Sequence, residues 1–568
     1  MFLLSFLVHA ALSAPPLPDL PSDDAVERVL AGELERALPT LQGAPDPAYY
    51  VALAAEDQRV VVLSATAGAL SVSDSRVGRT LDVDVRVGSP QLDSTHPLRG
   101  MSALREDGRS LVQVPFGVGD DFSLRHAIWQ TLDARFREAA ERIVVLRANQ
   151  AVKVEEETLA PDFEQRTGVQ DRRAVEPHPL DIPAWERTLV RASLVLDASP
   201  MIHASQASMR LVRQRTTLVD TEGTRLTHGG NWGTVDLSAS ATAPDGDVID
   251  VRKVITWRDP AHVPVEGVVL ESAQALVDRL GRMLAAPWGE PFSGPVILRG
   301  KASAVFFHEV MGHRVEGHRQ KRDDEGKTFL EYIGRPILPP FLDVVDDPTL
   351  ERLAGTDLFG HYAYDDEGVA AQRVPLVEKG IFKGFLMGRS PLPAFPTSNG
   401  HGRRSSGNAP TSRMGNTLIQ ARSSVPYAEL RRMLIEEIKA QKLPYGMIVD
   451  DIEGGFTMTG RYMPNAFNVR ATTTWRVYPD GRPDQLVRGL DLVGTPLVAF
   501  SSVLAAADDT EVFNGWCGAE SGSIPVAAAS PSLLVRKLEF QLKEKGEDRP
   551  PLMDKPADAP AGNDGRGA

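Results

Sequence analysis

Three of the twelve histidines lie close together near the middle of the chain, in the segment FFHEVMGHRVEGHRQ, at positions His308, His313 and His318. Glu309 directly follows the first of them. Neutral imidazole is a common metal ligand, and a carboxylate beside such a ligand can act as the base that takes a proton from water. The segment therefore suggests a catalytic metal site. The alternative is a helix whose scattered histidines pack or bond to nearby acids.

The spacing of His308 and His313 constrains the local backbone. Residues five apart lie about 140° apart around a regular α-helix, so their side chains would not meet. Both histidines can reach one metal ion only if a turn is widened, as in a π-bulge, or if the helix ends between them. We expect Gly312 to lower the cost of that distortion, because glycine tolerates unusual backbone angles.

Two histidines are too few for a catalytic zinc site, which commonly has three protein ligands. The only cysteine, Cys517, lies in the segment FNGWCG. A single cysteine excludes an intramolecular disulfide. Taken alone, Cys517 is more simply interpreted as an inert thiol in the core, since cysteine is often buried. The residues by themselves leave open whether it binds a metal.

Hydrophobic spacing predicts the elements that must position these residues. β-type runs separated by turn residues predict an antiparallel sheet in 49–87 and a second β-rich region in 189–257. Apolar residues recur at helical spacing in the segments 23–38, 122–149, 270–284 and 426–440.

The motif itself is expected on a buried helix. A strand at Pro295–Arg299 leads into the apolar run Ala302–Phe307, directly before His308. Residues 341–538 are mostly short strands and glycine turns. We therefore predict an α+β fold, with an N-terminal domain of helices on an antiparallel sheet and a β-rich C-terminal domain that carries the motif helix.

The length of 568 residues is too great for one ordinary domain. The charged, proline-bearing stretch before the second β-rich region is a candidate linker. The predicted units are a signal peptide at 1–14, an N-terminal α+β domain at 20–150, a linker at 151–188, a central β-rich domain at 189–290, a C-terminal domain with the candidate metal site at 291–540 and a disordered tail at 545–568.

Composition excludes some classes of function. With 42% hydrophobic and 24% charged residues, the chain is neither mainly disordered nor a polytopic membrane protein. Its net charge of −14 lacks the positive field of a nucleic-acid binder. No nucleic-acid partner and no stable membrane anchor are expected.

The N-terminus bears on location. Residues 1–12, MFLLSFLVHAAL, are almost wholly apolar and match the length of a signal-peptide core, although a cationic start is missing. Export to the periplasm or medium is the expectation. A mis-chosen start codon, and a cytoplasmic protein, is the alternative.

Five motifs in order resemble the TldD/PmbA family of zinc metallopeptidases, in its TldD-type catalytic branch. They are HEVMGHRVEGH at 308–318, GTDLFGHYAYDDEGVAAQRVPLVEKGIFKGFLMGR at 355–389, SNGHGRR at 398–404, PTSRMGNTLIQ at 410–420 and GWCGAESGSIPVAAASPSLLV at 515–535.

The resemblance implies one zinc ion per chain, bound by His308, His313 and Cys517, with Glu309 as the general base. It also implies a homodimer, or a heterodimer with a non-catalytic relative, that cleaves unfolded chains or small peptides lying as an added strand. The rival hypothesis is a partner subunit that binds peptides without cutting them. The intact residues His308, Glu309, His313 and Cys517 favour the enzyme.

Some residues depart from the family pattern or carry weaker signals. His318 stands where the family usually has an acid, and its role is open between orienting a ligand, joining the metal site and lying on the surface. His401 and Arg403, in a glycine-rich turn, either reach the substrate cleft or belong to a solvated loop. His361 and Tyr362 are weaker candidates for stabilising an oxyanion. The acidic run 365–368 lacks the ligand series of a calcium loop and is expected to be a polar turn.

Overall fold

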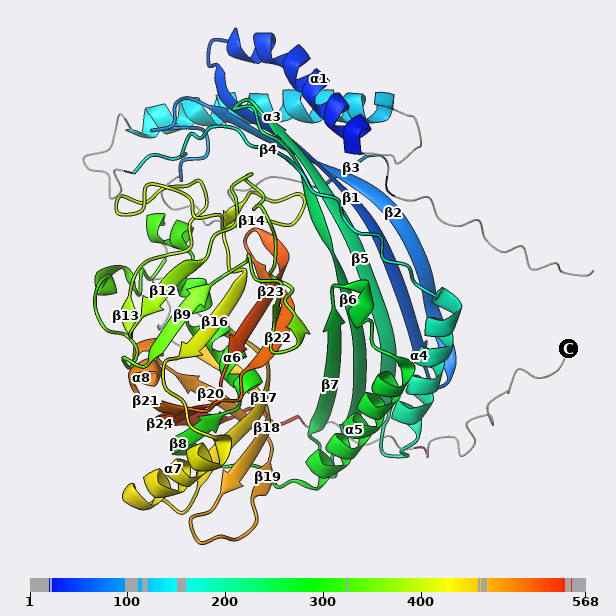
Figure 1. Ribbon diagram of the computed structural model, residues 1–568, viewed down its shortest axis with the longest axis vertical. Coiled ribbons are helices and arrows are strands. Elements are labelled where there is room, and N and C mark those ends of the chain that lie inside the picture. Colours follow the sequence, from blue (N-terminus) through cyan, green and yellow to red (C-terminus); the bar gives the residue numbers. More distant parts are fainter. Residues whose placement is uncertain are drawn as a thin grey trace, which may run out of the picture.

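A seven-stranded sheet formed by the first half of the chain runs along one side of the molecule (Figure 1). The computed structural model describes residues 23–97, 111–114, 121–150, 160–322, 325–457 and 467–546, together with Leu20, Gly460 and Met553. The strand order is β3-β2-β1-β5-β6-β4, with β7 also paired to β6. The strands are β1 (Ala48–Thr66), β2 (Ala69–Val87), β3 (Val112–Val114), β4 (Gln170–Arg172), β5 (Ala204–Asp220), β6 (Arg225–Thr242) and β7 (Val248–Trp257).

The predicted series of short runs in 49–87 is one long hairpin. β1 and β2 have 19 residues each and turn at Ala67-Gly68, where both residues have positive φ. Charged residues do not interrupt β1, because they are paired across the sheet. The carboxylate of Asp57 accepts hydrogen bonds from Arg79 on β2 at 2.6 Å and from Arg215 on β5 at 2.9 Å.

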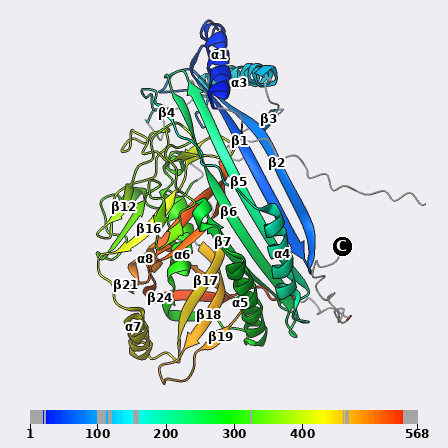
Figure 2. The same ribbon diagram turned by 45° about the vertical axis from the view of Figure 1, so that its right-hand side comes forward.

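The two faces of the large sheet have different neighbours, as strand alternation requires. Leu211 on β5 and Val235 on β6 pack in one core with α4 (Ile182–Asp197) and α5 (Glu266–Ala285). Their sequence neighbours Arg210 and Thr234 line a cavity on the other face. Figure 2 shows α4 running along the sheet, with the C-terminal half of the chain beside it.

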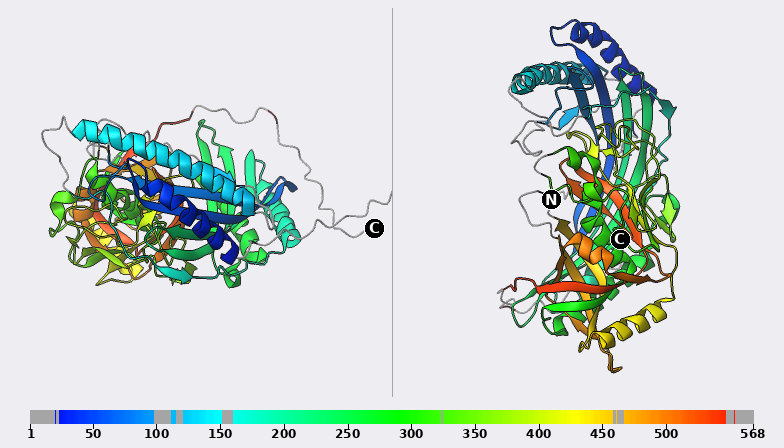
Figure 3. Two further views of the ribbon diagram at one scale, coloured as in Figure 1. Left: turned by 90° about the horizontal axis from the view of Figure 1, so that it is seen from above. Right: turned by 90° about the vertical axis from the view of Figure 1, so that its left-hand side faces the viewer.

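Helices α1 (Asp23–Gln42) and α3 (Asp121–Gln150) lie across one end of the large sheet (Figure 3). Their apolar faces, with Leu30 and Ile128 fully buried, form a core with β1 and β2. These helices and α5 confirm the helical spacing seen in the sequence.

Strands from both sides of the expected linker belong to the same sheet. β1 pairs with β5 along its length, from Ala52 opposite Asp220 to Ala65 opposite Ala207. Within 160–188 the chain forms β4, parallel to β6, and then begins α4, where Asp181 accepts a hydrogen bond from the backbone N–H of Ala184. The sequence boundary at 151–188 therefore does not divide two sheets.

The C-terminal half contains two further sheets. The order β13-β12-β9-β16-β23-β22 forms one, and β17-β8-β24-β20-β18-β19, with β21 on β24, forms the other. The first comprises β9 (Leu342–Asp346), β12 (Val374–Glu378), β13 (Ile381–Phe382), β16 (Asn416–Ala421), β22 (Glu511–Ala519) and β23 (Gly522–Ser530). The second comprises β8 (Phe292–Leu298), β17 (Gly446–Thr457), β18 (Phe467–Val477), β19 (Gln485–Val487), β20 (Leu490–Gly494), β21 (Val503–Ala506) and β24 (Leu533–Leu542).

Helix α6 (Gly300–Val310) follows β8 and is buried among these sheets. Phe306 and Phe307, fully buried, contact Phe500 of α8 (Pro496–Ser501) with ring centroids 6.0 and 5.1 Å away. Helix α7 (Tyr427–Ala440) covers the outside of β8 and β24. Two short pairs complete the half, β10 (Arg352–Leu353) with β11 (Thr356–Asp357) and β14 (Gly402–Arg403) with β15 (Thr411–Ser412).

The predicted α+β fold with antiparallel sheets and a β-rich C-terminal region is confirmed. The predicted signal peptide lies outside the described residues, and so does the predicted tail from residue 547 onward, except for Met553. Among the described residues, none of the helices has the length and apolar character needed to cross a membrane.

Candidate metal centre

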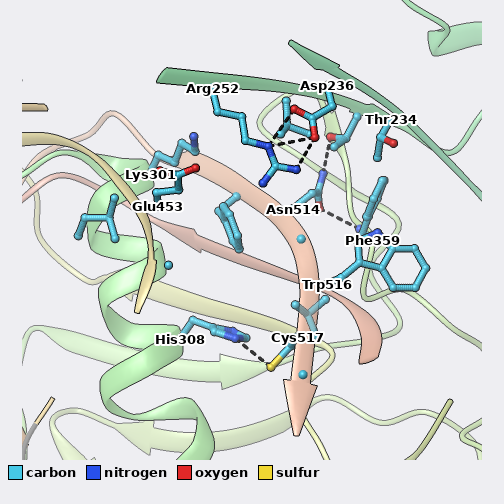
Figure 4. Close-up of a pocket in the computed structure, with 18 of the residues that line it drawn as sticks. Thr234, Asp236, Arg252, Lys301, His308, Phe359, Glu453, Asn514, Trp516 and Cys517 are labelled. Carbon is cyan, nitrogen blue, oxygen red and sulfur yellow. Dashed lines mark hydrogen bonds and ion pairs between the residues drawn. The ribbon is translucent and has the colours of Figure 1, made fainter. Parts of the chain in front are cut away.

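His308, His313 and Cys517 come together beside α6. The Nε2 atom of His308 lies 3.3 Å from the Sγ atom of Cys517, and the Nε2 atom of His313 lies 3.4 Å from it. One donor atom from each residue lies within 4.8 Å of the other two. Figure 4 shows His308 on the helix pointing toward Cys517 on β22. These are the three residues that the sequence motifs single out as metal ligands.

His308 and His313 can approach each other, although they are five residues apart, because the helix ends between them. α6 ends at Val310, and a 3-10 helix covers Gly312–Val315, so His308 and His313 belong to different helical segments. This is one of the two arrangements that the spacing allowed.

Gly312 was expected to lower the cost of distorting the backbone, and this expectation was wrong. Its φ is not positive, so it is not needed for backbone freedom. A Cβ atom at this position would lie 2.0 Å from the Sδ atom of Met414. Gly312 is therefore required by the close approach of a core side chain.

Cys517 is positioned by a strand at the edge of its sheet. β22 pairs with β23, where Cys517 lies opposite Ile524, and β23 pairs in parallel with β16. α6 packs against both β22 and β23, which brings the thiol to the end of the helix. Cys517 is 6% exposed and packs with the C-terminal core, while its Sγ atom contacts the imidazoles of His308 and His313.

A fully buried carboxylate, Glu316, holds the second histidine. Its Oε2 atom is 3.3 Å from the Nδ1 atom of His313 and accepts a hydrogen bond from Arg319 Nε at 2.9 Å. Burial by itself would raise the pKa of Glu316, but His313, Arg319 and Arg413 together lower it to about 2. Carboxylate support of this kind fixes the orientation of a ligating imidazole. His308 differs, because its Nδ1 atom is buried without a hydrogen-bond partner among the described residues.

The two histidines hold Cys517 as an anion. Burial raises the pKa of the Cys517 thiol, but His308 and His313 outweigh burial and hold that pKa well below its usual range. Burial lowers the pKa of both imidazoles, but Cys517 outweighs burial at His308, and Glu316 and Cys517 raise the pKa of His313 to about 10. A thiolate is the form of cysteine that binds metals, and a metal ion here would replace the protons on the imidazoles.

A cavity of about 970 Å³ opens in front of this cluster. One wall is the face of the large sheet that α4 and α5 leave uncovered, and the other is built from α6, β17 and β22. Glu309, His308 and His313 all line it. Burial raises the pKa of Glu309, which makes it a stronger base than an exposed carboxylate.

His318 does not join the three donor atoms. Its Nε2 atom contacts Glu520, and its side chain is 11% exposed, so the surface alternative is wrong. Glu520 also accepts a hydrogen bond from Arg319 at 2.9 Å. His318 is thus linked to the metal cluster indirectly, through Glu520, Arg319 and Glu316.

The four weaker candidates lie beside the cavity rather than among the residues that line it. His401 is fully buried, with Nε2 3.1 Å from Asp346 Oδ1, and Arg403 donates to the carbonyl of Met414 at 2.7 Å. The Nδ1 atom of His361 lies 2.9 Å from the carbonyl oxygen of Pro348.

Tyr362 completes this group, and its hydroxyl donates to the carbonyl of Gly400 at 2.8 Å. The four side chains are therefore committed to internal contacts in this structure. The acidic run 365–368 is a hydrogen-bonded turn, as expected, in which Asp365 accepts from the backbone N–H groups of Glu367 and Val369.

Sequence reasoning missed Glu316 and Arg413 as supporting residues. The guanidinium of Arg413 is fully buried and bonds to the carbonyl of Cys517 and to the hydroxyl of Ser521, both within 2.8 Å. The signal was present, since both residues lie inside the quoted motifs HEVMGHRVEGH and PTSRMGNTLIQ. Only the fold shows that these motifs meet.

Known proteins resemble this chain in sequence and in fold. Residues 292–542 match the family described as the PmbA/TldA metallopeptidase C-terminal domain. A metalloprotease from Methanothermobacter thermautotrophicus is 26% identical over 476 residues, which are 80% of this chain and 94% of that protein. A zinc metalloprotease TldD homolog from Saccharolobus solfataricus is 25% identical over 310 residues, which are 53% of this chain and 64% of that protein.

A solved structure, TldE from Thermococcus kodakarensis, has the same fold. Its TM-score is 0.59 at 14% identity, over 91% of this chain and 99% of that chain. Fold and site together define an α+β protein with a His–His–Cys cluster in a cavity, and relatives that match most of its length are named metalloproteases. Residues 292–542 thus match the C-terminal domain of this metallopeptidase family, and the chain as a whole is similar to proteins named metalloproteases.

Proposed function

We propose that the protein is a zinc-dependent peptidase of the TldD type that cleaves unfolded proteins or small peptides. The observation that carries this proposal is the position of Glu309 in one cavity with His308, His313 and Cys517. A base and three metal donors thus line a space large enough for several residues of a peptide.

The donor set fits zinc. Zinc binds imidazole nitrogen and thiolate sulfur at about 2.0–2.3 Å, and tetrahedral geometry then separates nitrogen and sulfur ligands by about 3.5 Å. The two nitrogen–sulfur distances here are 3.3 and 3.4 Å. The carboxylate of Glu316 behind His313 is a further feature of zinc sites. One relative also has zinc in its name.

A zinc ion at this site would supply a Lewis acid for the peptide carbonyl and would lower the pKa of water. The carboxylate of Glu309 would accept a proton from the attacking water and return it to the leaving amine nitrogen. The free edge of β22 would position the substrate, since β22 is the terminal strand in its sheet and lines the cavity. Strand addition at such an edge is a common mode of peptide binding.

Cleavage of casein by wild type and Glu309→Gln, with zinc measured in both, tests this proposal. The variant keeps the size of the side chain but cannot take the proton. We expect it to retain zinc and to cut about 100- to 10,000-fold more slowly. Equal cleavage by the two proteins would remove Glu309 from the mechanism.

The alternative is a non-catalytic peptide-binding subunit. It is favoured if wild type, loaded with zinc, binds peptide and does not cut it, even with a family partner present. A homodimer, or a heterodimer with a relative such as TldE, also forms part of the proposal, and the solved TldE structure with this fold supports it. The mass in solution, measured alone and with candidate partners, tests the assembly.

Export is proposed on the apolar start of the sequence alone. N-terminal sequencing of the natural protein, combined with cell fractionation, tests it. A mature chain that begins at Met1 and fractionates with the cytosol would reject export.

A further inference from the structure

A large aromatic side chain, Trp516, is open to the cavity next to the metal cluster. Trp516 precedes Cys517 on β22, lines the cavity and is 40% exposed. Neighbouring side chains in a strand point to opposite faces. Since Cys517 faces α6, Trp516 faces the large sheet.

The large sheet holds Trp516 in a defined position. Its ring lies 6.5 Å from the ring of Trp232 on β6, and the guanidinium of Arg210 on β5 lies 5.7 Å from its centroid. A cation over the face of an indole is attractive. Contacts with Trp232 and Arg210 therefore hold the side chain of Trp516 in one orientation.

Phe359 lies behind this part of the wall, is only 1% exposed and is fixed from two directions. Its carbonyl accepts a hydrogen bond from the indole of Trp232 at 3.0 Å, and its N–H donates to Asn514 on β22 at 2.9 Å. Val62 on β1 also lines the cavity. Trp516 and Val62 thus give the cavity apolar surface next to the His–His–Cys cluster.

The rest of the cavity has a different character. Lys301 forms an ion pair with Asp451 at 3.0 Å, and Arg279 reaches the same carboxylate at 3.2 Å. In Figure 4, Lys301 and Glu453 lie on one side of β22 and Phe359 lies on the other. Lys301 and Glu453 therefore lie across β22 from Phe359, and Arg210 is the charged group next to Trp516.

We propose that Trp516, backed by the buried rings of Trp232 and Phe359, forms a subsite for a large apolar, preferably aromatic, side chain of the peptide close to the scissile bond. This inference rests on the proposed function, because it assumes that a peptide enters the cavity. Burial of an aromatic side chain against Trp516 would favour such peptides by about tenfold or more.

The test uses full-length protein with Glu309→Gln, so that peptide is not consumed. The probe is a polar, unfolded peptide in which one Ser is replaced by Phe, with the replacement moved along a set of otherwise identical peptides. Calorimetry is expected to give about tenfold tighter binding for at least one Phe position than for the Ser parent. Adding Trp516→Ala should remove that preference, whereas Trp516→Phe should keep most of it.

Trp129→Ala provides the matched control, because Trp129 is 52% exposed on α3 and does not line the cavity. It should leave the preference unchanged. Trp516→Gln, which keeps a flat side chain, serves as a second variant if Trp516→Ala folds poorly. Zinc content and the midpoint of unfolding identify such a variant.

The result that overturns the subsite is either equal binding of all Phe and Ser peptides or a Phe preference that survives Trp516→Ala and Trp516→Gln in full. Failure of the peptidase proposal gives a different outcome. If wild type cuts no peptide but the Phe preference depends on Trp516, the subsite stands and the protein is a binding subunit.

Discussion

The guanidinium of Arg413 donates a hydrogen bond to the backbone carbonyl of Cys517 at 2.7 Å, and its Nε atom lies 3.2 Å from the carboxylate of Glu316. The carboxylate of Glu316 in turn contacts the Nδ1 atom of His313. A buried ion pair therefore connects the strand that carries one proposed ligand to the segment that carries another.

Arg413→Lys should weaken metal binding without unfolding the protein. Lysine keeps the charge but cannot bond to Cys517, Ser521 and Glu316 together, because it lacks the planar fork. Loss of such supporting contacts typically reduces metal affinity about 10- to 100-fold. Competition with a chelator measures the affinity. Arg422→Lys, at a half-exposed surface pair with Asp343, is the control and should bind zinc as wild type does.

Cys517→Ala should remove most of the bound zinc. The substitution deletes the anionic donor and leaves two imidazoles, which is fewer than a catalytic zinc site uses. Mass spectrometry of the metal content of purified protein checks this. His126→Ala, which removes a possible metal donor on α3 away from the site, is the control and should leave the zinc content unchanged. Full zinc occupancy in Cys517→Ala would show that the ligand set is wrong.

Gly312→Ala should reduce both stability and zinc content. The new methyl group would lie 2.0 Å from Met414 Sδ, so the segment carrying His313 or the methionine must move. Overpacking of this kind typically costs about 1–3 kcal/mol. Adding Met414→Ala makes room and should recover part of the zinc content. No recovery in the double variant would place the cause in the backbone instead.

Glu56 should make the stability fall as pH rises from about 5 to 7. Burial raises the pKa of Glu56 to about 7, above its ordinary value of 4.5. In this window the unfolded chain releases the proton and the folded chain keeps it, so the free energy of unfolding decreases with pH. Glu56→Gln should flatten this dependence, as measured by urea midpoints at pH 5 and pH 8. Glu271→Gln, at an exposed position on α5, should leave the dependence unchanged.

Local elements could be predicted from the sequence, and long-range pairing could not. The apolar spacing of α1, α3, α5 and α7 specifies one buried face, and the run before His308 gave the buried helix α6. Periodicity does not specify which strands pair, and β5 lies about 150 residues after β1 in the chain. The two β-rich regions were therefore predicted to be separate domains. Asp57 can lie inside β1 because Arg79 and Arg215, both distant in sequence, pair with it across the sheet.

In the candidate metal centre, too, the residue types could be predicted from the sequence and the long-range contacts could not. The residue types of His308, Glu309, His313 and Cys517 specify their chemistry, so motifs could single them out. His401 and Arg403 looked equally suited to a cleft, since a glycine-rich turn with cationic side chains reads as a loop. Their burial depends on Asp346 and Met414, which reach them only through the tertiary fold.

His308 and Cys517 are separated by 209 positions in the chain, and β22 is held in place by β23, which follows it. During synthesis the motif helix therefore leaves the ribosome long before the thiol strand exists. A chain that stops short of β23 has the base and two imidazoles but no completed centre. The order of the elements would thus keep a nascent or truncated chain from completing the proposed metal centre before β22 and β23 have been made.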